Sequence, residues 1–326
     1  MNAPLILDTH IDIRWPAPPD WTQHGAMCVD LPKMIAGGVS AATFIAYVPQ
    51  GPRDAVGLAA ASARALAMLE HIRARADGHA SRFCATPDDV ERGGPPAVLS
   101  AVENGHAMGL DLGHIARWRA LGACYLTVTH DGHNMLSDSA RPKRNLGDAD
   151  ALHGGLSPLG RAAIAEMNRV GLMVDCSHVS KAGMMQAAGL SRVPIAVTHT
   201  ACAALCPHPR NLDDEQLDMV RAVGGVAQVT AVAAFLRPTP PNEPSRATVS
   251  DLVDHVDHAV RRISLDHVGI SSDFDGGGGV KGWMNAAETP NVTAELARRG
   301  YGPREIALLW SGNFLRVWRA VLRGAG

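Results

Sequence analysis

Eight short apolar runs are spread along the chain. Each is shorter than a helix of normal length, and several are rich in Val and Ile. Continuous apolar runs of this kind are typical of strands that are buried on both faces of a parallel sheet. The runs cover residues 5–7, 39–48, 97–102, 123–129, 172–177, 194–198, 225–230 and 267–272.

Segments with helical periodicity separate these predicted strands. They cover residues 55–75, 158–170, 213–223, 249–263 and 303–322, and Pro158 opens the second at a first helical position that favours proline. Eight strands that alternate with helices predict an α/β fold, a (β/α)8 TIM-type barrel, with its active site at the carboxyl ends of the strands. We expect one such domain over residues 1–326.

Six of the predicted strands end on or near a side chain that can bind a metal. After the first strand, His10 and Asp12 lie two residues apart and therefore project to the same face of an extended chain. A plainer interpretation of this pair is a surface Asp beside a core histidine. Because several strand ends converge at one barrel mouth, we favour a shared two-metal site. The residues at these ends are His10, Asp12, Glu103, His130, His178, His199 and Asp273.

The donor set indicates which metals and which chemistry to expect. Imidazoles and carboxylates without a thiolate suit Zn²⁺, although Mn²⁺, Fe²⁺ and Co²⁺ stay open. The two oxygens of Glu103 can bridge two ions. A carbamylated lysine could serve as the bridge instead, but none of the four lysines lies on a predicted strand. Two ions about 3.5–4 Å apart can hold a hydroxide between them and generate a nucleophile at neutral pH. We therefore expect hydrolysis rather than redox chemistry.

Composition narrows the classes of partner. The 30 basic and 32 acidic residues give a formal net charge of −2 without a basic stripe, so we expect no nucleic acid partner. We find neither a signal peptide nor a membrane span of about 18 apolar residues, which predicts a cytoplasmic protein that binds no membrane. The six cysteines form no CxxC pair and are expected as reduced thiols. A homodimer is left open.

Nine motifs in a fixed order carry a resemblance that covers essentially the whole chain. The segment DTHID at 8–12 is similar to D-x-H-N-D, AVENGH at 101–106 to V-E-G-G-H, and LTVTH at 126–130 to L-T-L-T-H. Six further matches lie at 154–160, 174–180, 198–200, 209–212, 269–276 and 312–317. Together they resemble the membrane (renal) dipeptidases, zinc-dependent dipeptidases of the metal-dependent hydrolase (amidohydrolase-like) superfamily.

This resemblance implies a role for each candidate residue. It implies a binuclear zinc dipeptidase in which a hydroxide, held between the ions beside the bridging Glu103, attacks the peptide bond. One ion would be held by His10, Asp12 and Glu103, and the other by Glu103, His178 and His199. Some members of the family accept a D-residue at the carboxyl-terminal position, so L,D- as well as L,L-dipeptides are expected substrates.

Three residues are implied at the substrate. His130 would bind the scissile carbonyl oxygen as an oxyanion stabiliser, and Arg210 would hold the terminal carboxylate with its guanidinium fork. Asp273 would take a proton from the attacking water and pass it to the leaving amine. Plainer interpretations are an exposed loop arginine at 210 and, for Asp273, a cap of the glycine-rich loop at 276–279.

The chain also departs from the family pattern. Ile11 replaces the usual Asn, Arg14-Trp15 stands where Pro-Trp is common, and the stretch 230–235 lacks an aromatic side chain often seen there. Because such loops line the pocket, substrate choice is less well determined than the metal core. Another metal-dependent amidohydrolase, acting on an N-acyl amino acid or a lactam, is the alternative. A non-catalytic binding protein would require a broken site, and no ligand position is substituted.

Seven other histidines receive structural interpretations. His106 is expected to support the metal site through a hydrogen bond to a ligand. The remaining six are expected to face water, in loops at His133, His153 and His208 and on helices at His114, His255 and His258.

Overall fold

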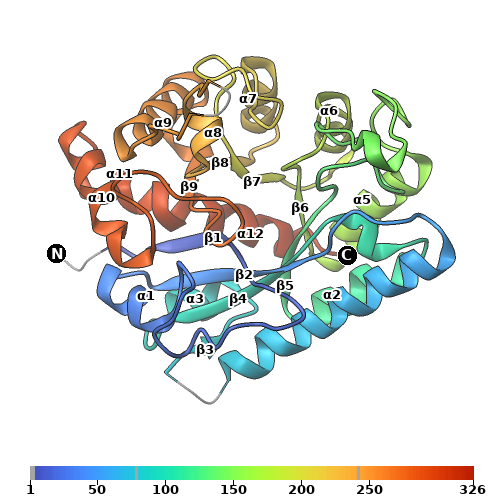
Figure 1. Ribbon diagram of the computed structural model, residues 1–326, viewed down its shortest axis with the longest axis horizontal. Helices are drawn as coiled ribbons and strands as arrows, with labels where there is room; N and C mark the ends of the chain where they lie inside the picture. Colours follow the sequence, from blue (N-terminus) through green and yellow to red (C-terminus); the bar gives the residue numbers. More distant parts are fainter. Residues whose placement is uncertain (1–3, 78–79, 241–242) are drawn as a thin grey trace.

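The structure is a computed structural model that describes residues 4–77, 80–240 and 243–326. At its centre, eight parallel strands form a nearly closed barrel in the order β1-β2-β4-β5-β6-β7-β8-β9 (Figure 1). The ring closes through a parallel bridge between Ile11 and Phe274, with the amide of Asp12 donating to the carbonyl of Phe274 at 3.0 Å. The predicted α/β barrel is therefore confirmed.

All eight predicted strands are present. They are β1 (Leu7–Asp12), β2 (Ala41–Tyr47), β4 (Ala97–Glu103), β5 (Ala123–Thr127), β6 (Met173–Asp175), β7 (Ala196–Thr200), β8 (Val226–Thr230) and β9 (Val268–Ser271). One further strand, β3 (Arg82–Phe83), was not predicted. It pairs with Ala97 and Val98 at the start of β4, before β5 joins β4 at Ser100.

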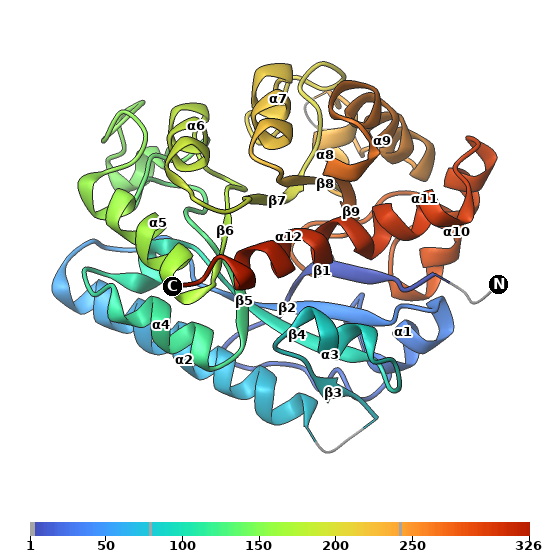
Figure 2. The same cartoon turned by 180° about the vertical axis from the view of Figure 1, so that it is seen from behind.

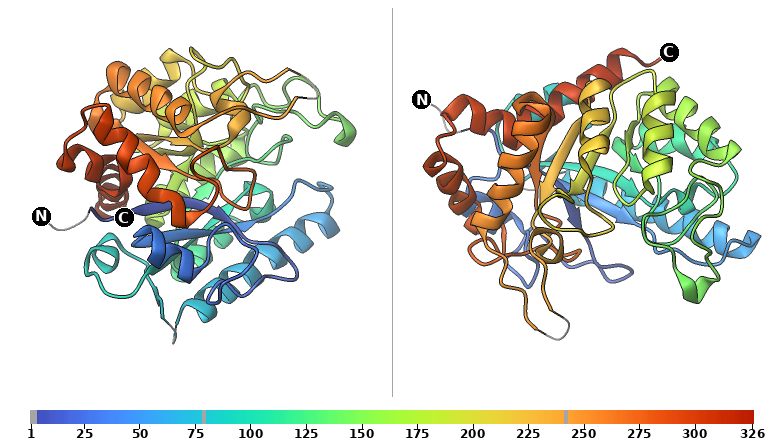
Figure 3. Two further views of the ribbon diagram at one scale, coloured as in Figure 1. Left: turned by 60° about the vertical axis from the view of Figure 1, so that its left-hand side comes forward. Right: turned by 90° about the horizontal axis from the view of Figure 1, so that it is seen from above.

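Helices surround the strands, as Figure 3 shows from two directions. They are α1 (Leu31–Gly37), α2 (Ala55–Ala76), α3 (Pro87–Glu91), α4 (Gly113–Ala120), α5 (Pro158–Val170), α6 (Lys181–Leu190), α7 (Asp214–Ala222), α8 (Ala233–Leu236), α9 (Val249–Ile263), α10 (Thr289–Arg298), α11 (Pro303–Ala307) and α12 (Asn313–Arg323). The predicted limits of α5 hold because Ser157 caps its first turn and Gly171, in the left-handed region, ends it. The helix expected over 303–322 is divided by a π-helical turn at Leu308–Gly312.

Two hydrophobic cores stabilise this arrangement. The larger one fills the space between the strands and the outer helices. The smaller one lies inside the barrel, where inward side chains such as Leu99, Tyr125 and Met173 pack with Phe314 and Trp318 of α12. Figure 2 shows α12 lying across the barrel beside β1. Helix α12 therefore closes the end of the barrel opposite the carboxyl ends of the strands.

Among the described residues, α2 is the one helix long and apolar enough to cross a membrane, judged by length and composition only. Its residues Ala65, Met68, Leu69 and Ile72 are buried on the side that contacts β2 and β4. One apolar face against a barrel is what an outer helix of this fold requires. The cytoplasmic location stays a prediction.

Candidate metal centre and active site

The fold brings the predicted ligand residues together at one end of the barrel. His10 and Asp12 lie on β1, Glu103 is the last residue of β4, and His199 lies on β7. His130, His178 and Asp273 follow closely after β5, β6 and β9. All of them lie at the carboxyl ends of parallel strands, the position at which barrel enzymes place their active sites.

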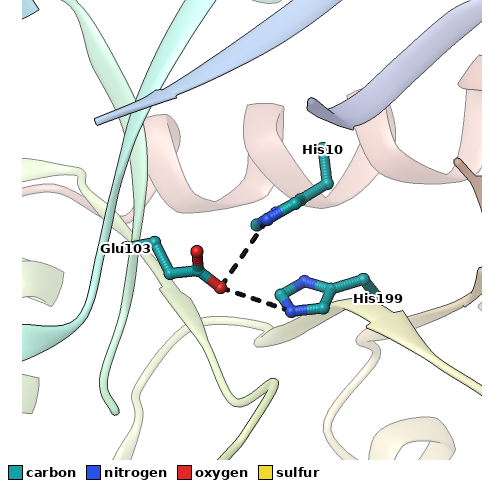
Figure 4. A group of neighbouring side chains, drawn as sticks. All are labelled: His10, Glu103 and His199. Carbon is teal, nitrogen blue, oxygen red and sulfur yellow. Dashed lines mark ion pairs between the residues drawn. The ribbon is translucent and has the colours of Figure 1, made fainter. Parts of the chain in front are cut away.

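Glu103 lies at the centre of this cluster. Its Oε1 is 3.6 Å from Nε2 of His10, 3.4 Å from Nε2 of His178 and 3.3 Å from Nε2 of His199. Figure 4 shows the first and last of these contacts. The residue is 2% exposed, and its Oε1 has no hydrogen-bond partner among the described residues. Burial raises the pKa of Glu103 to about 8.

The other ring nitrogen of His10 shows where its proton lies. Nδ1 of His10 is 2.9 Å from the hydroxyl of Tyr125. That hydroxyl donates its own proton to the carbonyl oxygen of Thr9 at 2.8 Å. Tyr125 must therefore accept from His10, so Nδ1 of His10 carries a proton. The other ring nitrogen, Nε2, faces Oε1 of Glu103 at 3.6 Å.

The same reasoning applies to the other two imidazoles. Thr198 donates to the carboxylate of Asp175 at 2.8 Å, so its hydroxyl accepts from Nδ1 of His199 at 3.0 Å. Nδ1 of His178 lies 3.1 Å from Oδ1 of Asp131, and an ionised carboxylate only accepts. Burial lowers the pKa of both histidines well below the usual value, so both rings are neutral at pH 7.

Three imidazole Nε2 atoms thus lie 3.3–3.6 Å from one carboxyl oxygen of Glu103, which forms no hydrogen bond with any described residue. A protonated Glu103 would satisfy only one of the three imidazoles. Divalent cations satisfy all four atoms, and a histidine whose second nitrogen is held by a hydroxyl or carboxylate is the usual arrangement at a metal. The residues present therefore fit metal ions.

Two further carboxylates border the cluster. Oδ1 of Asp12 is buried and has no hydrogen-bond partner in the part of the chain that the structure describes. Burial raises the pKa of Asp12 to about 7 and that of Asp273 to about 8. A Cβ at Gly276 would lie 1.9 Å from Oδ2 of Asp12 and 2.6 Å from Oδ1 of Asp273, so only glycine lets the backbone approach both groups.

Potential ligand atoms lie within 4.8 Å of one another in three overlapping groups. These groups are His10, Glu103 and His199; Glu103, His130 and His178; and His10, Asp12 and Asp273. Glu103 and His10 each belong to two groups. This overlap is the arrangement that neighbouring ions with shared ligands require.

His130 and Arg210 present unpartnered polar groups to the same region. Burial lowers the pKa of His130 well below the usual value, and its Nδ1 is buried without a partner among the described residues. Arg210 is 4% exposed, and its Nη2 donates to the carbonyl of His199 at 3.2 Å. Its Nε has no hydrogen-bond partner among the residues described, and the guanidinium carbon lies 5.2 Å from the ring centre of Phe235. The interpretation of Arg210 as an exposed loop residue is therefore wrong.

A cavity of about 480 Å³ opens beside the cluster. Asp12 and His130 form part of its wall, so a molecule in the cavity reaches the candidate site. The remaining wall comes from the loop after β1, from β2 and α2, and from the loop after β9. Its other residues are Ile13, Arg14, Trp15, Pro19, Ala26, Met27, Tyr47, Arg64, Asp275 and Gly276.

Several other histidines differ from expectation. His133 is fully buried, with Nδ1 accepting from the amide of Ser139 and Nε2 at 3.0 Å from the carbonyl of Ala149. His255 is buried in the same manner between Cys202 and Leu236. His106 contacts Gln50 at 3.3 Å, and the described residues show no hydrogen bond from its ring to a candidate ligand. His153, His208, His114 and His258 are partly exposed.

Sequence reasoning missed the residues that orient the imidazoles. These are Tyr125, Asp131, Asp175 and Thr198, which lie on or just after the strands that carry the candidate ligands. Asp131 directly follows His130, and that adjacency was the only local signal available. Nothing near it in the sequence indicates that its partner is His178.

Comparisons with known proteins identify relatives of this chain. The chain is 35% identical over 234 residues to the dipeptidase verJ of Clonostachys rogersoniana, a match that covers 72% of this chain and 57% of the relative. Among solved structures, the probable dipeptidase PvdM from Pseudomonas aeruginosa superimposes with a TM-score of 0.89 at 30% identity, over 99% of this chain and 96% of that one.

A metallo peptidase from Rhodobacter sphaeroides, liganded with a phosphinate mimic of the dipeptide L-Ala-D-Ala, superimposes with a TM-score of 0.85 at 25% identity. That match covers 98% of this chain and all of the other (100%). The sequence model of the family described as membrane dipeptidase (peptidase family M19) matches residues 1–325. This chain therefore belongs to the membrane dipeptidase family, peptidase family M19.

Proposed function

We propose that this chain is a binuclear zinc dipeptidase on one barrel domain over residues 1–326. The observation that carries the proposal is the convergence of the Nε2 atoms of His10, His178 and His199 on the buried carboxyl group of Glu103. Dipeptidase names among its relatives support the choice of substrate.

In this proposal Glu103 would hold both ions. His10 and Asp12 would hold one of them with it, and His178 and His199 would hold the other. Nitrogen and oxygen ligands without a thiolate suit zinc. When bound, the ions supply a Lewis acid and lower the pKa of the attacking water.

Two residues bind the substrate. Arg210 is buried with an unpartnered Nε, and a free carboxylate would satisfy this donor with a charge-assisted hydrogen bond. His130 presents a neutral ring to the cavity, and its Nε2–H would bind the scissile carbonyl oxygen as negative charge develops on it. Dipeptides satisfy both donors because their terminal carboxylate lies one residue from the peptide bond.

Asp273 moves the proton. Its carboxyl group belongs to the same cluster as His10 and Asp12, and burial raises its pKa to about 8. A group with a pKa near neutrality can accept the proton of the attacking water and then donate it to the leaving amine. The backbone amides of Gly276 and Gly278 donate to the carbonyl of Asp273, at 3.2 and 2.7 Å, rather than to its side chain, which leaves the carboxyl group free for this role.

The stereochemistry and the alternative substrates are settled by the same experiment. The ligand of the Rhodobacter sphaeroides structure, a mimic of L-Ala-D-Ala, supports L,D-dipeptides as substrates, and we propose L,L-dipeptides beside them. Purified protein loaded with zinc is assayed against Ala-Ala in both configurations, N-acetyl-alanine and a lactam, and its metal content is determined. We expect two ions per chain and hydrolysis of the dipeptides.

Chelation with EDTA should abolish the hydrolysis, and Glu103→Gln should impair binding of both ions because a neutral amide bridges poorly. Hydrolysis of the N-acyl amino acid or the lactam in place of the dipeptides would identify a different amidohydrolase. Full activity with only trace metal would overturn the metal assignment.

A further inference from the structure

Two arginines line the cavity beside the metal cluster without an acidic partner. Arg64 projects from the third turn of α2 and is partly buried, whereas Arg14 follows β1 and is exposed. Neither guanidinium forms an ion pair with any residue that the structure describes. Nε of Arg64 donates to the carbonyl of Tyr47 at 3.0 Å, which anchors the side chain, and its two Nη groups make no hydrogen bond among the described residues.

The anchoring contact sets the position of Arg64 relative to the metal cluster. Tyr47 is the last residue of β2, and its register partner on β4 is Glu103. Neighbouring strands lie about 4.8 Å apart, so the backbone that holds Arg64 is adjacent to the backbone that carries the central carboxylate. The ring of Tyr47 lies 4.8 Å from the ring of His130 and continues the same cavity wall.

The carboxylates of the cavity are already engaged. Asp12 belongs to the group of potential metal ligands. Asp275 accepts from the backbone amide of Cys28 at 3.0 and 3.1 Å and from that of Val29 at 3.3 Å. The arginines are therefore the groups of this wall whose charge has no partner. A partly buried guanidinium loses hydrogen bonds to water. A bound anion replaces them with charge-assisted hydrogen bonds.

The two cationic positions of the site lie on opposite sides of the barrel. Arg210 follows β7, the sixth strand of the ring, and Arg64 is anchored to β2, the second. In a ring of eight strands these positions face each other across the metal cluster. A dipeptide whose terminal carboxylate is held by Arg210 therefore directs its amino-terminal residue toward Arg64.

We propose that Arg64, assisted by Arg14, selects dipeptides whose amino-terminal residue carries an acidic side chain, Asp or Glu. This inference rests on the proposed dipeptidase function and specifies its substrate class. Arg64 is a specificity-determining residue that contacts the side-chain carboxylate, and Arg14 adds positive charge at the exposed rim. Arg14 stands at one of the positions where the chain departs from the family pattern.

The test compares L-Glu-L-Ala with its isostere L-Gln-L-Ala, and with L-Leu-L-Ala, in the zinc-loaded enzyme. Wild-type protein should have a kcat/KM for Glu-Ala at least about 10-fold above that for Gln-Ala, as expected for one charge-assisted hydrogen bond. Arg64→Gln should bring this ratio close to one, mainly through KM, because the contact exists in both ground and transition states. Arg64→Lys should keep part of the preference.

Arg73→Gln is the matched control, since it removes the same charge from an exposed position of the same helix outside the cavity. It should leave the Glu-to-Gln ratio unchanged. A wild-type enzyme that cleaves all three dipeptides at equal kcat/KM, or an Arg64→Gln variant that keeps the preference, would show that the specificity assignment is wrong. Failure to cleave any dipeptide would instead refute the proposed function, and this inference with it.

Discussion

Metal loading should release protons in a pH-dependent manner, because the central carboxyl groups are protonated in the metal-free protein. Burial raises the pKa of Glu103 to about 8 and that of Asp12 to about 7. At pH 7 these values correspond to about 0.9 and about 0.5 bound protons, or about 1.4 in total. At pH 9 the sum falls to about 0.1. His178 and His199 are neutral at both pH values and contribute nothing.

The same protonation weakens metal binding in acid. Each pH unit below 8 costs about 1.4 kcal/mol, or a factor of about 10 in affinity, for Glu103 alone. Between pH 8 and pH 6 the apparent dissociation constant should therefore rise by somewhat less than about 100-fold from this group. Protonation of Asp12 adds to the loss below pH 7.

Isothermal titration of the chelated protein with zinc, in buffers of different ionisation enthalpy, measures the released protons directly. Glu103→Gln, titrated at saturating metal, should release about 0.9 protons fewer than wild type at pH 7 and about the same number at pH 9. Protons that come from a coordinated water are common to both proteins and cancel in this difference. An equal release by the two proteins at pH 7 would refute the reasoning, because Glu103 would then be ionised before the metal arrives or would not bind it.

Three other outcomes follow from the same contacts. Arg210→Ala should reduce kcat/KM for a free dipeptide about 10- to 150-fold, the range of one charge-assisted hydrogen bond, and should change hydrolysis of the amidated dipeptide little; equal losses on both substrates would mean that Arg210 is structural. Asp131→Asn should weaken zinc binding about 10- to 100-fold, because the charge that orients His178 and raises its basicity is lost; an unchanged zinc affinity in a competition assay would exclude this role. Protein in EDTA should melt at lower temperature at pH 9 than at pH 7, because the folded state binds more protons than the unfolded chain at Asp12, Glu103 and Asp273, whose pKa values are raised, and stability falls as pH rises through these values; a melting temperature that rises over this range would contradict the raised values.

The barrel could be predicted because its strands are buried on both faces. Runs such as 97–102 and 123–129 contain hardly any polar positions, and they appear as strands in the structure. Strand β3 could not be found in this way, since its two residues are defined only by backbone pairing with β4. The closing role of α12 was also hidden. The sequence of α12 shows an apolar face. It does not show whether this face packs against the inside of the barrel or against its outer surface.

The candidate ligands could be predicted because a parallel barrel brings all strand ends to one mouth. Residues that depend on contacts between distant segments could not. In the sequence, His133 lies in a predicted loop and His255 on a predicted helix, and both were expected to face water. In the structure both are buried, and both ring nitrogens of each contact other segments. Arg64 gave no signal, because its helical spacing is that of an ordinary residue on an outer helix. Its place in the cavity follows from how α2 packs beside β2.

Two of the candidate ligands lie on either side of a sparsely paired junction between neighbouring strands, which is called a seam here. Strands β2 and β4 are paired at seven positions, whereas β6 and β7 are paired at one, between Asp175 and Ala196. His178 follows β6 and His199 lies on β7, so they flank this seam. Cations bound between these two histidines would link strands that share few backbone pairs. They would then stabilise the barrel in addition to their role in catalysis. Metal loss should therefore be felt as faster amide hydrogen exchange along β6 and β7, a local opening of the barrel wall rather than a change confined to the mouth.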